Sequence, residues 1–273
     1  MSVLSLDELD RCLRLAPTDD SGTFRGDNIP IGTDRVFGGQ IMGQAVMAAA
    51  SAAPEKSLKS FTHLFAREGA TDTPVDFDVT SLHNGRTYAS ARVAARQGER
   101  TIGHTLMSFH TPEDGPTLLP VGDPPGSPDD ARPVDLGILP WDVRIVGDVD
   151  LFDRRSQPSE CALWMRAPVR ADDEWMQKAL LAHATDLSMI GTLLLPVEGV
   201  AQQDNGVRVH TAVTSHTMWF HDDIHLDDWL LIRQRGLALN RSRGFGTGDV
   251  FTADGRLVAA YAQESMIRVM AAG

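Results

Sequence analysis

The chain has 273 residues, a length that allows one large domain or two domains of about 100–150 residues. Hydrophobic residues make up 42% of the sequence and charged residues 23%, which excludes a disordered chain. The formal net charge of −12 argues against nucleic acid or an anionic membrane as a partner, because binding to their phosphates needs clustered Lys and Arg.

The N-terminal region predicts neither secretion nor membrane insertion. It carries acidic residues where a signal peptide has basic ones followed by an apolar run. No stretch approaches the roughly 18 consecutive apolar residues of a membrane span. The two cysteines, Cys12 and Cys161, provide neither a disulfide framework nor a thiolate metal cluster. We therefore expect a cytoplasmic protein with no membrane span.

The first half of the chain begins with a helical pattern and continues with strand patterns. Residues Gly38–Ser51 are apolar or small almost all round, which predicts a buried helix. Turn signals at Asn84-Gly85 and Gln97-Gly98 separate runs that are typical of strands. These predicted strands are Val75–Leu82, Tyr88–Arg96 and Thr101–Phe109.

A proline-rich connector follows. Residues 111–140 hold about half of the 15 prolines and cannot form a helix or a central strand, because proline lacks a backbone N–H. We therefore predict an N-terminal domain at 1–112, a linker at 113–139 and a C-terminal domain at 140–273.

The second half repeats the pattern of the first. Asp186–Leu195, which stops at Pro196, predicts a second buried helix, and Asp254-Gly255 predicts a hairpin turn. The predicted strands are His210–Phe220, Trp229–Leu239, Phe245–Phe251 and Leu257–Val269.

Matching residues in the two halves indicate an internal duplication. Arg86, Tyr88, Val93 and Gly98 match Arg243, Phe245, Val250 and Gly255, each with an offset of 157. Thr62–Phe65 matches Thr217–Phe220 with an offset of 155, and Met42-Gly43 matches Ile190-Gly191 with an offset of 148. The sequence therefore predicts an α+β fold of two copies, each with one buried helix against a curved antiparallel sheet.

Seven motifs stand in the order of a known family. They are Arg35–Gln40, Gly85-x-x-Tyr88-x-x-x-Arg92-Val93, Trp164–Arg166, Asp186–Met189, His216–His221, Arg243–Phe245 and Gln263-Glu264. Through these motifs the chain resembles the acyl-CoA thioesterase II family from about residue 20 to residue 268. The resemblance implies a double hotdog fold, two hotdog domains in tandem, and hydrolysis of fatty acyl-CoA to a free fatty acid and coenzyme A without metal or cofactor.

The resemblance also implies three catalytic positions that hold and polarise the attacking water. Asp186 falls on the family's Asp, at the start of the second-half helix, and Gln263 falls on its Gln. The hydroxyl position falls on Val213, so this chain departs from the family there. Thr214 is the candidate replacement if a β-bulge turns it inward, and Thr211 and Ser215 remain alternatives.

Each site residue also has a purely structural interpretation. Asp186 is typical of a helix N-cap, and free N–H groups at that helix start could stabilise an oxyanion. Gln263 fits the outward face of a strand. His210, His216, His221 and His225 lack a standard metal-ligand spacing, and the GxGxG motif at Gly244–Gly248 does not stand between a strand and a helix as a dinucleotide motif does. These patterns favour a site without metal.

Two other functions remain open from the sequence. The absence of a hydroxyl at Val213 is the reason to consider, as an alternative, an acyl-CoA-binding protein with weak or no turnover. The segment Gly26–Pro30 faintly resembles the signature of hotdog enoyl-CoA hydratases, but Gly32 stands where their His is required. For every alternative the expected partner is acyl-CoA, whose phosphates would need arginines such as Arg154, Arg155, Arg241 and Arg243. We also expect a homo-oligomer, because open sheet faces of hotdog proteins are normally paired.

Overall fold

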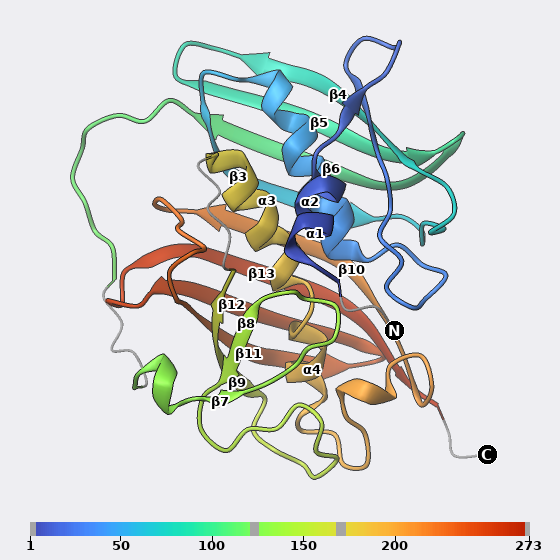
Figure 1. Ribbon diagram of the computed structural model, residues 1–273, viewed down its shortest axis with the longest axis vertical. Helices are drawn as coiled ribbons and strands as arrows, with labels where there is room; N and C mark the ends of the chain where they lie inside the picture. The colour runs from blue at the N-terminus through green and yellow to red at the C-terminus, as the bar shows by residue number, and fades with distance from the viewer. Residues whose placement is uncertain (1–3, 121–125, 168–172, 271–273) are drawn as a thin grey trace.

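One continuous antiparallel sheet forms the frame of the protein (Figure 1). The computed structural model describes residues 4–120, 126–167 and 173–270. Within these residues the sheet has 13 strands in the order β1-β2-β4-β5-β6-β3-β10-β13-β12-β11-β9-β8-β7. Figure 1 shows α1, α2 and α3 in front of one face of this sheet. The α+β class expected from the sequence is therefore confirmed.

The two halves of the chain contribute elements in the same order. In the first half, β2 is followed by α2, β3, β4, β5 and β6, and in the second half β9 is followed by α3, α4, β10, β11, β12 and β13. The first half comprises α1 (Leu6–Leu13), β1 (Ala16–Pro17), β2 (Thr23–Gly26), α2 (Gly38–Ala49), β3 (Ser57–Phe65), β4 (Val75–Asn84), β5 (Tyr88–Gln97) and β6 (Arg100–His110). The second comprises β7 (Arg132–Pro133), β8 (Asp142–Ile145), β9 (Glu160–Arg166), α3 (Glu174–Thr185), α4 (Met189–Leu194), β10 (Val209–Phe220), β11 (Leu230–Asn240), β12 (Arg243–Thr252) and β13 (Leu257–Val269).

All seven predicted strands are present, and the predicted hairpin glycines lie in turns. Gly98 and Gly255 both adopt positive φ, 60° and 89°, which glycine reaches without steric cost. In the described part of the connector, 111–120 and 126–140, the regular structure is limited to a short 3₁₀ turn at Pro128–Asp130 and strand β7. Residues 121–125 of the connector lie outside the described residues.

The main helix of the second half is not where the sequence pattern placed it. It is α3, which ends at Thr185, whereas α4 occupies only part of the predicted segment. The match of Met42-Gly43 with Ile190-Gly191 is therefore wrong, since α3 begins 136 positions after α2. Three polar residues of α3 obscure its apolar pattern although all are buried: Gln177, Lys178 and His183.

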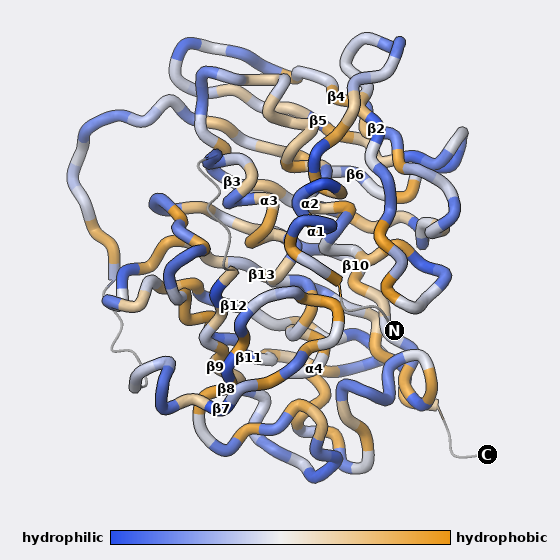
Figure 2. Tube along the Cα trace, in the orientation of Figure 1, coloured by the Kyte–Doolittle hydropathy of each residue, from blue (hydrophilic) through white to orange (hydrophobic). Residues whose placement is uncertain are grey.

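Helices α2 and α3 pack tightly against each other because α2 has glycine at the contact. A Cβ on Gly39 would lie 2.4 Å from the His183 carbonyl oxygen, and one on Gly43 would lie 3.0 Å from that of Ala179. Both distances leave too little room for a side chain. The hydrophobic core lies between these helices and the inner face of the sheet, and many peripheral loops and hairpin ends are hydrophilic (Figure 2).

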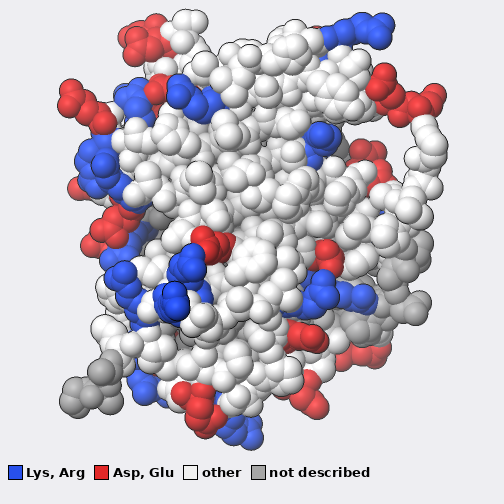
Figure 3. Space-filling model, turned by 180° about the vertical axis from the view of Figure 1, so that it is seen from behind, with Lys and Arg blue, Asp and Glu red and all other residues white. Residues whose placement is uncertain are grey.

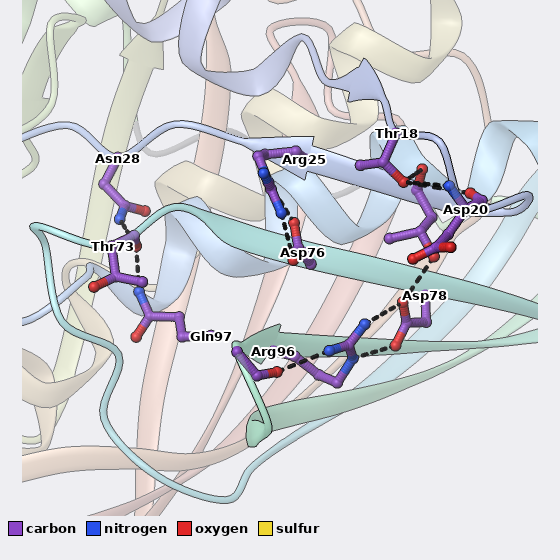
Figure 4. Close-up of polar contacts among 11 residues, drawn as sticks. Thr18, Asp20, Arg25, Asn28, Thr73, Asp76, Asp78, Arg96 and Gln97 are labelled. Carbon is purple, nitrogen blue, oxygen red and sulfur yellow. Dashed lines mark hydrogen bonds and ion pairs between the residues drawn. The ribbon is translucent and has the colours of Figure 1, made fainter.

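Ion pairs and hydrogen bonds connect the outer strands and loops of the first half (Figure 4). Arg25 on β2 forms a two-point ion pair with Asp76 on β4, at 2.7 and 2.9 Å. Arg96 pairs with Asp78 one strand further on. Gln97 donates to the Ala70 carbonyl oxygen at 2.7 Å and accepts from the Ala70 N–H at 2.8 Å, which fixes the loop before β4.

Candidate active site

Asp186 is a buried residue of the second half that lies against a helix of the first half. It is the C-cap residue of α3 and is 4% exposed. Its carboxyl reaches the N-terminus of α2: a Cβ on Gly38 would lie 2.7 Å from Asp186 Oδ2. The glycine pair Gly38-Gly39 therefore gives the carboxyl space to approach the backbone of α2.

This placement corrects the structural interpretation of Asp186. The residue is not the N-cap of its own helix, because α4 begins at Met189 after Ser188 and α3 has already ended. The helix start beside Asp186 belongs to α2. Its N-cap, Phe37, offers no side-chain hydrogen bond, so the first N–H groups of α2 are available to other acceptors.

Burial changes the protonation of Asp186. Loss of hydration raises the pKa of this carboxyl from 3.8 to about 7, and a hydrogen bond from the Gly39 backbone N–H partly opposes the rise. Its Oδ1 is buried and has no hydrogen-bond partner among the described residues. Since a buried carboxyl oxygen normally has a partner, this atom is a place where water or substrate can bind.

Gln263 is fully buried on the inner face of β13, so its interpretation as an outward-facing residue is wrong. Its Oε1 lies 3.0 Å from His216 Nδ1 on the neighbouring strand β10. The opposite ring nitrogen of His216 lies 3.4 Å from the Thr185 hydroxyl, next to Asp186 in the chain. A chain of buried polar groups therefore runs from the end of α3 to Gln263.

His216 is held neutral at physiological pH. Burial lowers the pKa of its imidazole to about 4, and the hydrogen bond to Gln263 opposes this. A neutral imidazole carries one N–H. Because an amide oxygen can only accept, Gln263 Oε1 accepts from Nδ1–H of His216, and the Gln263 amide nitrogen is directed away from the ring.

Strand β10 has a bulge at the position of the expected hydroxyl. The register with β13 shifts between Val213 and Ser215, which leaves Thr214 as the extra residue. Thr214 is exposed, and its hydroxyl donates to the Glu264 carbonyl oxygen at 3.0 Å. The Thr211 hydroxyl donates to Asn205 Oδ1 at 2.6 Å. Ser215 lies opposite Glu264 in the β10–β13 ladder, and Glu264 is only partly buried.

Val213 itself faces inward, and its partner across the ladder is Ser265. Ser265 is fully buried and accepts a hydrogen bond from Gln263 Nε2 at 3.2 Å. His216, Thr185 and Ser265 are polar residues of this site that the sequence interpretation missed. Alternation along β13 could have found Ser265, because Tyr261 and Ile267 mark its inner face and Gln263 and Ser265 lie between them.

The GxGxG motif on β12 makes room for other parts of this region. A Cβ on Gly246 would lie 2.5 Å from Met189 Sδ, and one on Gly248 would lie 2.3 Å from the Tyr261 ring. Gly244 and Gly246 pair with Ser265 and Gln263 across the sheet. The glycines therefore let α4 and the Tyr261 ring pack close against β12.

The remaining motifs have structural partners. Arg154 forms a two-point ion pair with the buried Asp204, and Arg155 pairs with Asp153. Within the hydratase-like segment, Asn28 donates to the Thr73 carbonyl oxygen at 2.6 Å and so anchors a loop. Across the described ranges, no three His, Cys, Asp or Glu residues are grouped as metal ligands.

Family models account for most of the sequence. The acyl-CoA thioesterase N-terminal domain matches residues 25–110, and the acyl-CoA thioesterase C-terminal domain matches residues 112–267. The chain belongs to the acyl-CoA thioesterase family. Acyl-CoA thioesterase 2 of Haemophilus influenzae is 32% identical to this family member, and the alignment covers 96% of this chain and 98% of that protein.

Solved structures share the fold of this chain. The acyl-CoA thioesterase II TesB2 from Mycobacterium marinum matches with a TM-score of 0.82 at 26% identity, covering 96% of this chain and 99% of that one. A protein with a hot dog fold from Alicyclobacillus acidocaldarius matches with a TM-score of 0.78 at 20% identity, covering 96% and 98%. In the part of the chain that the structure describes, no helix has the length and apolar character to cross a membrane.

Proposed function

We propose that this acyl-CoA thioesterase hydrolyses fatty acyl-CoA at the site around Asp186. Water adds to the thioester carbonyl carbon, the C–S bond breaks, and the products are a carboxylic acid and the free thiol of coenzyme A. The observation that supports this site best is the buried Asp186 carboxyl, with one unpaired oxygen, beside the N-terminus of α2.

Asp186 is the proposed general base. A base is most effective when its pKa lies near the working pH, and burial brings the pKa of Asp186 to about 7. In its ionised form it takes a proton from the attacking water. The proton then passes to the departing thiolate, so the carboxylate is regenerated at the end of the cycle.

The N-terminus of α2 is the proposed oxyanion site. Addition of water places negative charge on the thioester oxygen, and the backbone N–H groups at a helix start, together with the helix dipole, stabilise such a charge. This arrangement joins both halves in one site, because the base comes from the end of α3 and the N–H donors come from the start of α2. Gln263, which His216 holds in place, orients the water.

The coenzyme A part of the substrate has a proposed entrance at the β11–β12 hairpin. A pocket of about 320 Å³ is lined there by Arg241, Ser242 and Ile267, among others. Ile267 stands two residues after Ser265 on the same face of β13, so the pocket is lined by the strand that carries Gln263 and Ser265. Arg241 forms no ion pair with any described residue, and its guanidinium is therefore available to a phosphate.

The shared order of elements supports a finer description of the fold. We infer two hotdog domains joined by the proline-rich connector, that is, a double hotdog fold that arose by duplication.

We also infer an oligomer. The sheet carries exposed Leu64, Leu106 and Trp219 on β3, β6 and β10, and the face seen in Figure 3 has a largely uncharged upper centre. Light scattering coupled to gel filtration tests this: a monomer at micromolar concentration would refute it.

Release of free thiol from acyl-CoA tests the proposed reaction. Purified protein is mixed with acyl-CoA of several chain lengths, and Asp186→Asn is assayed beside it. We expect turnover by the wild type and a loss of roughly 100-fold or more in kcat for the variant. Equal activity of the variant would refute the site, and no cleavage at any chain length would refute the reaction.

A further inference from the structure

Ser265 is a buried hydroxyl that no family position accounts for. It lies two residues after Gln263 on the same face of β13 and is 0% exposed. Its Oγ accepts a hydrogen bond from Gln263 Nε2 at 3.2 Å. The residue is therefore fixed by the same side chain that the resemblance places in the catalytic set.

The strand register brings Ser265 to the position of the missing hydroxyl. Val213, where the family's hydroxyl would stand, is the direct partner of Ser265 across the β10–β13 ladder. Partner residues of an antiparallel pair point to the same face, with Cβ atoms about 4.5–5.5 Å apart. A hydroxyl on β13 can thus reach the space that a hydroxyl on β10 would reach.

The direction of the hydrogen bonds leaves the Ser265 proton free. Neutral His216 donates from Nδ1 to Gln263 Oε1, and Gln263 donates from Nε2 to Ser265 Oγ. Ser265 is the last acceptor in this series of two hydrogen bonds, so its oxygen accepts from the protein. Within the described residues it has no hydrogen-bond acceptor of its own, and its O–H can donate to a bound molecule.

Thr214 is the competing source of a hydroxyl. It is the bulge residue of β10, it is exposed, and its O–H is already donated to the Glu264 carbonyl oxygen. The Thr214 hydroxyl lies outside the series of buried polar groups that contains Gln263. Its role is therefore to stabilise the backbone of the bulge.

We propose that Ser265 is a catalytic residue that replaces the hydroxyl absent from Val213 and holds the attacking water together with Asp186. His216 is a positioning residue that holds Gln263, and Gln263, which also orients the water, donates to the Ser265 oxygen. This inference rests on the proposed thioester hydrolysis at this site. It explains how a chain with valine at position 213 of β10 keeps three polar groups around the water, namely Asp186, Gln263 and Ser265.

Substitutions that move the hydroxyl side chain from β13 to β10 test the proposal. Thiol release from acyl-CoA is measured for the wild type, Ser265→Ala, Val213→Ser and the double variant Ser265→Ala/Val213→Ser. Thr214→Val is the matched control, since it removes a hydroxyl from the neighbouring position. Thermal unfolding of each protein shows whether the fold is kept.

We expect Ser265→Ala to lower kcat by roughly 100-fold with KM changed less than about 3-fold, because a group that acts in the transition state affects kcat. The double variant should recover at least about tenfold of that loss, whereas Thr214→Val should stay within about twofold of the wild type. A purely structural role for Ser265 would not predict recovery by a hydroxyl on β10.

Wild-type kcat in Ser265→Ala, or a large loss in Thr214→Val, would overturn the role of Ser265 while leaving the reaction intact. A wild type that cleaves no acyl-CoA would overturn both. If Ser265→Ala does not unfold cooperatively, Ser265→Cys replaces it as a variant of similar size with a weak donor. A fall of at least about tenfold in its kcat supports the proposal, and an unchanged kcat overturns it.

Discussion

The hydroxyl oxygens of Thr62 and Thr217 lie 3.1 Å apart across the junction of β3 and β10. These two threonines occupy equivalent places in the repeated motif, with an offset of 155. Equivalent residues that face each other in an antiparallel pair lie beside a local twofold axis, as in a symmetric dimer. The contact supports the proposed duplication and explains why one site can use groups from both halves.

Asp186→Asn should stabilise the protein at neutral pH while removing activity. Because the pKa of Asp186 is raised on folding, the wild type has no penalty below about pH 4, loses stability as pH rises from 4 to 7, and stays at the lower level above 7. The full rise corresponds to roughly 4 kcal/mol. Urea unfolding of both proteins at pH 4 and pH 8 checks this. A gain at pH 4 as large as that at pH 8 would contradict it.

The pH dependence of kcat/KM should report the ionisation of Asp186. We expect the rate to fall about tenfold per pH unit below an apparent pKa of about 7, because only the ionised carboxyl accepts a proton. His216 has a pKa of about 4 and stays neutral through this range. Steady-state kinetics from pH 5 to 9 measure the profile, and a rate that is constant between pH 5 and 8 would argue against Asp186 as the base.

Arg241→Gln should weaken substrate binding without slowing the chemical step. Loss of an exposed contact to a phosphate should raise KM by about 2- to 5-fold and reduce its dependence on salt, while kcat stays unchanged. Arg155→Gln is the control, because that arginine already pairs with Asp153. The measurement is KM of both variants between roughly 20 and 300 mM salt, the range in which screening becomes strong. An identical salt dependence in both variants would exclude Arg241 as the phosphate contact.

Gly246→Ala should destabilise the fold. The new Cβ would lie 2.5 Å from Met189 Sδ and 2.8 Å from the Arg235 carbonyl oxygen, and the backbone of β11 cannot yield easily. We expect a loss of about 1–3 kcal/mol. Gly115→Ala is the control, since nothing lies within 4 Å of its Cβ position. Chemical unfolding of both variants measures the difference, and equal stabilities would mean that α4 adapts without cost.

Lys178 should contribute to the attachment of α3 to the first half. Its buried ammonium donates to the Leu58 carbonyl oxygen at 2.8 Å and to Ser57 at 2.6 Å, and it pairs with Glu174. Lys178→Ala should cost about 2–4 kcal/mol, because it leaves buried acceptors unpaired and opens a cavity. Lys178→Met, which keeps the apolar stem, should cost less. Denaturant midpoints compare them, and equal losses would show that the charge alone matters.

The sequence by itself determined seven of the 13 strands in the described residues, the turns between them and the family. Alternation of apolar residues and turn-forming glycines are local signals, so seven strands could be placed from residue order alone. The carboxyl and amide positions, Asp186 and Gln263, followed from motifs. Helix α3 could not be placed in this way, because Lys178, Gln177 and His183 are polar yet buried. Their contacts are with Leu58, Leu226 and Phe37, which are distant in the sequence.

Only the tertiary structure decided how the candidate site is assembled. The bulge at Thr214 and the pairing of Val213 with Ser265 depend on the register of two strands that lie about 50 residues apart in the chain. The approach of Asp186 to the start of α2 depends on the packing of two helices from different halves, where Gly38 and Gly39 leave space for it. Such relations are set by nonlocal packing, which residue order does not display.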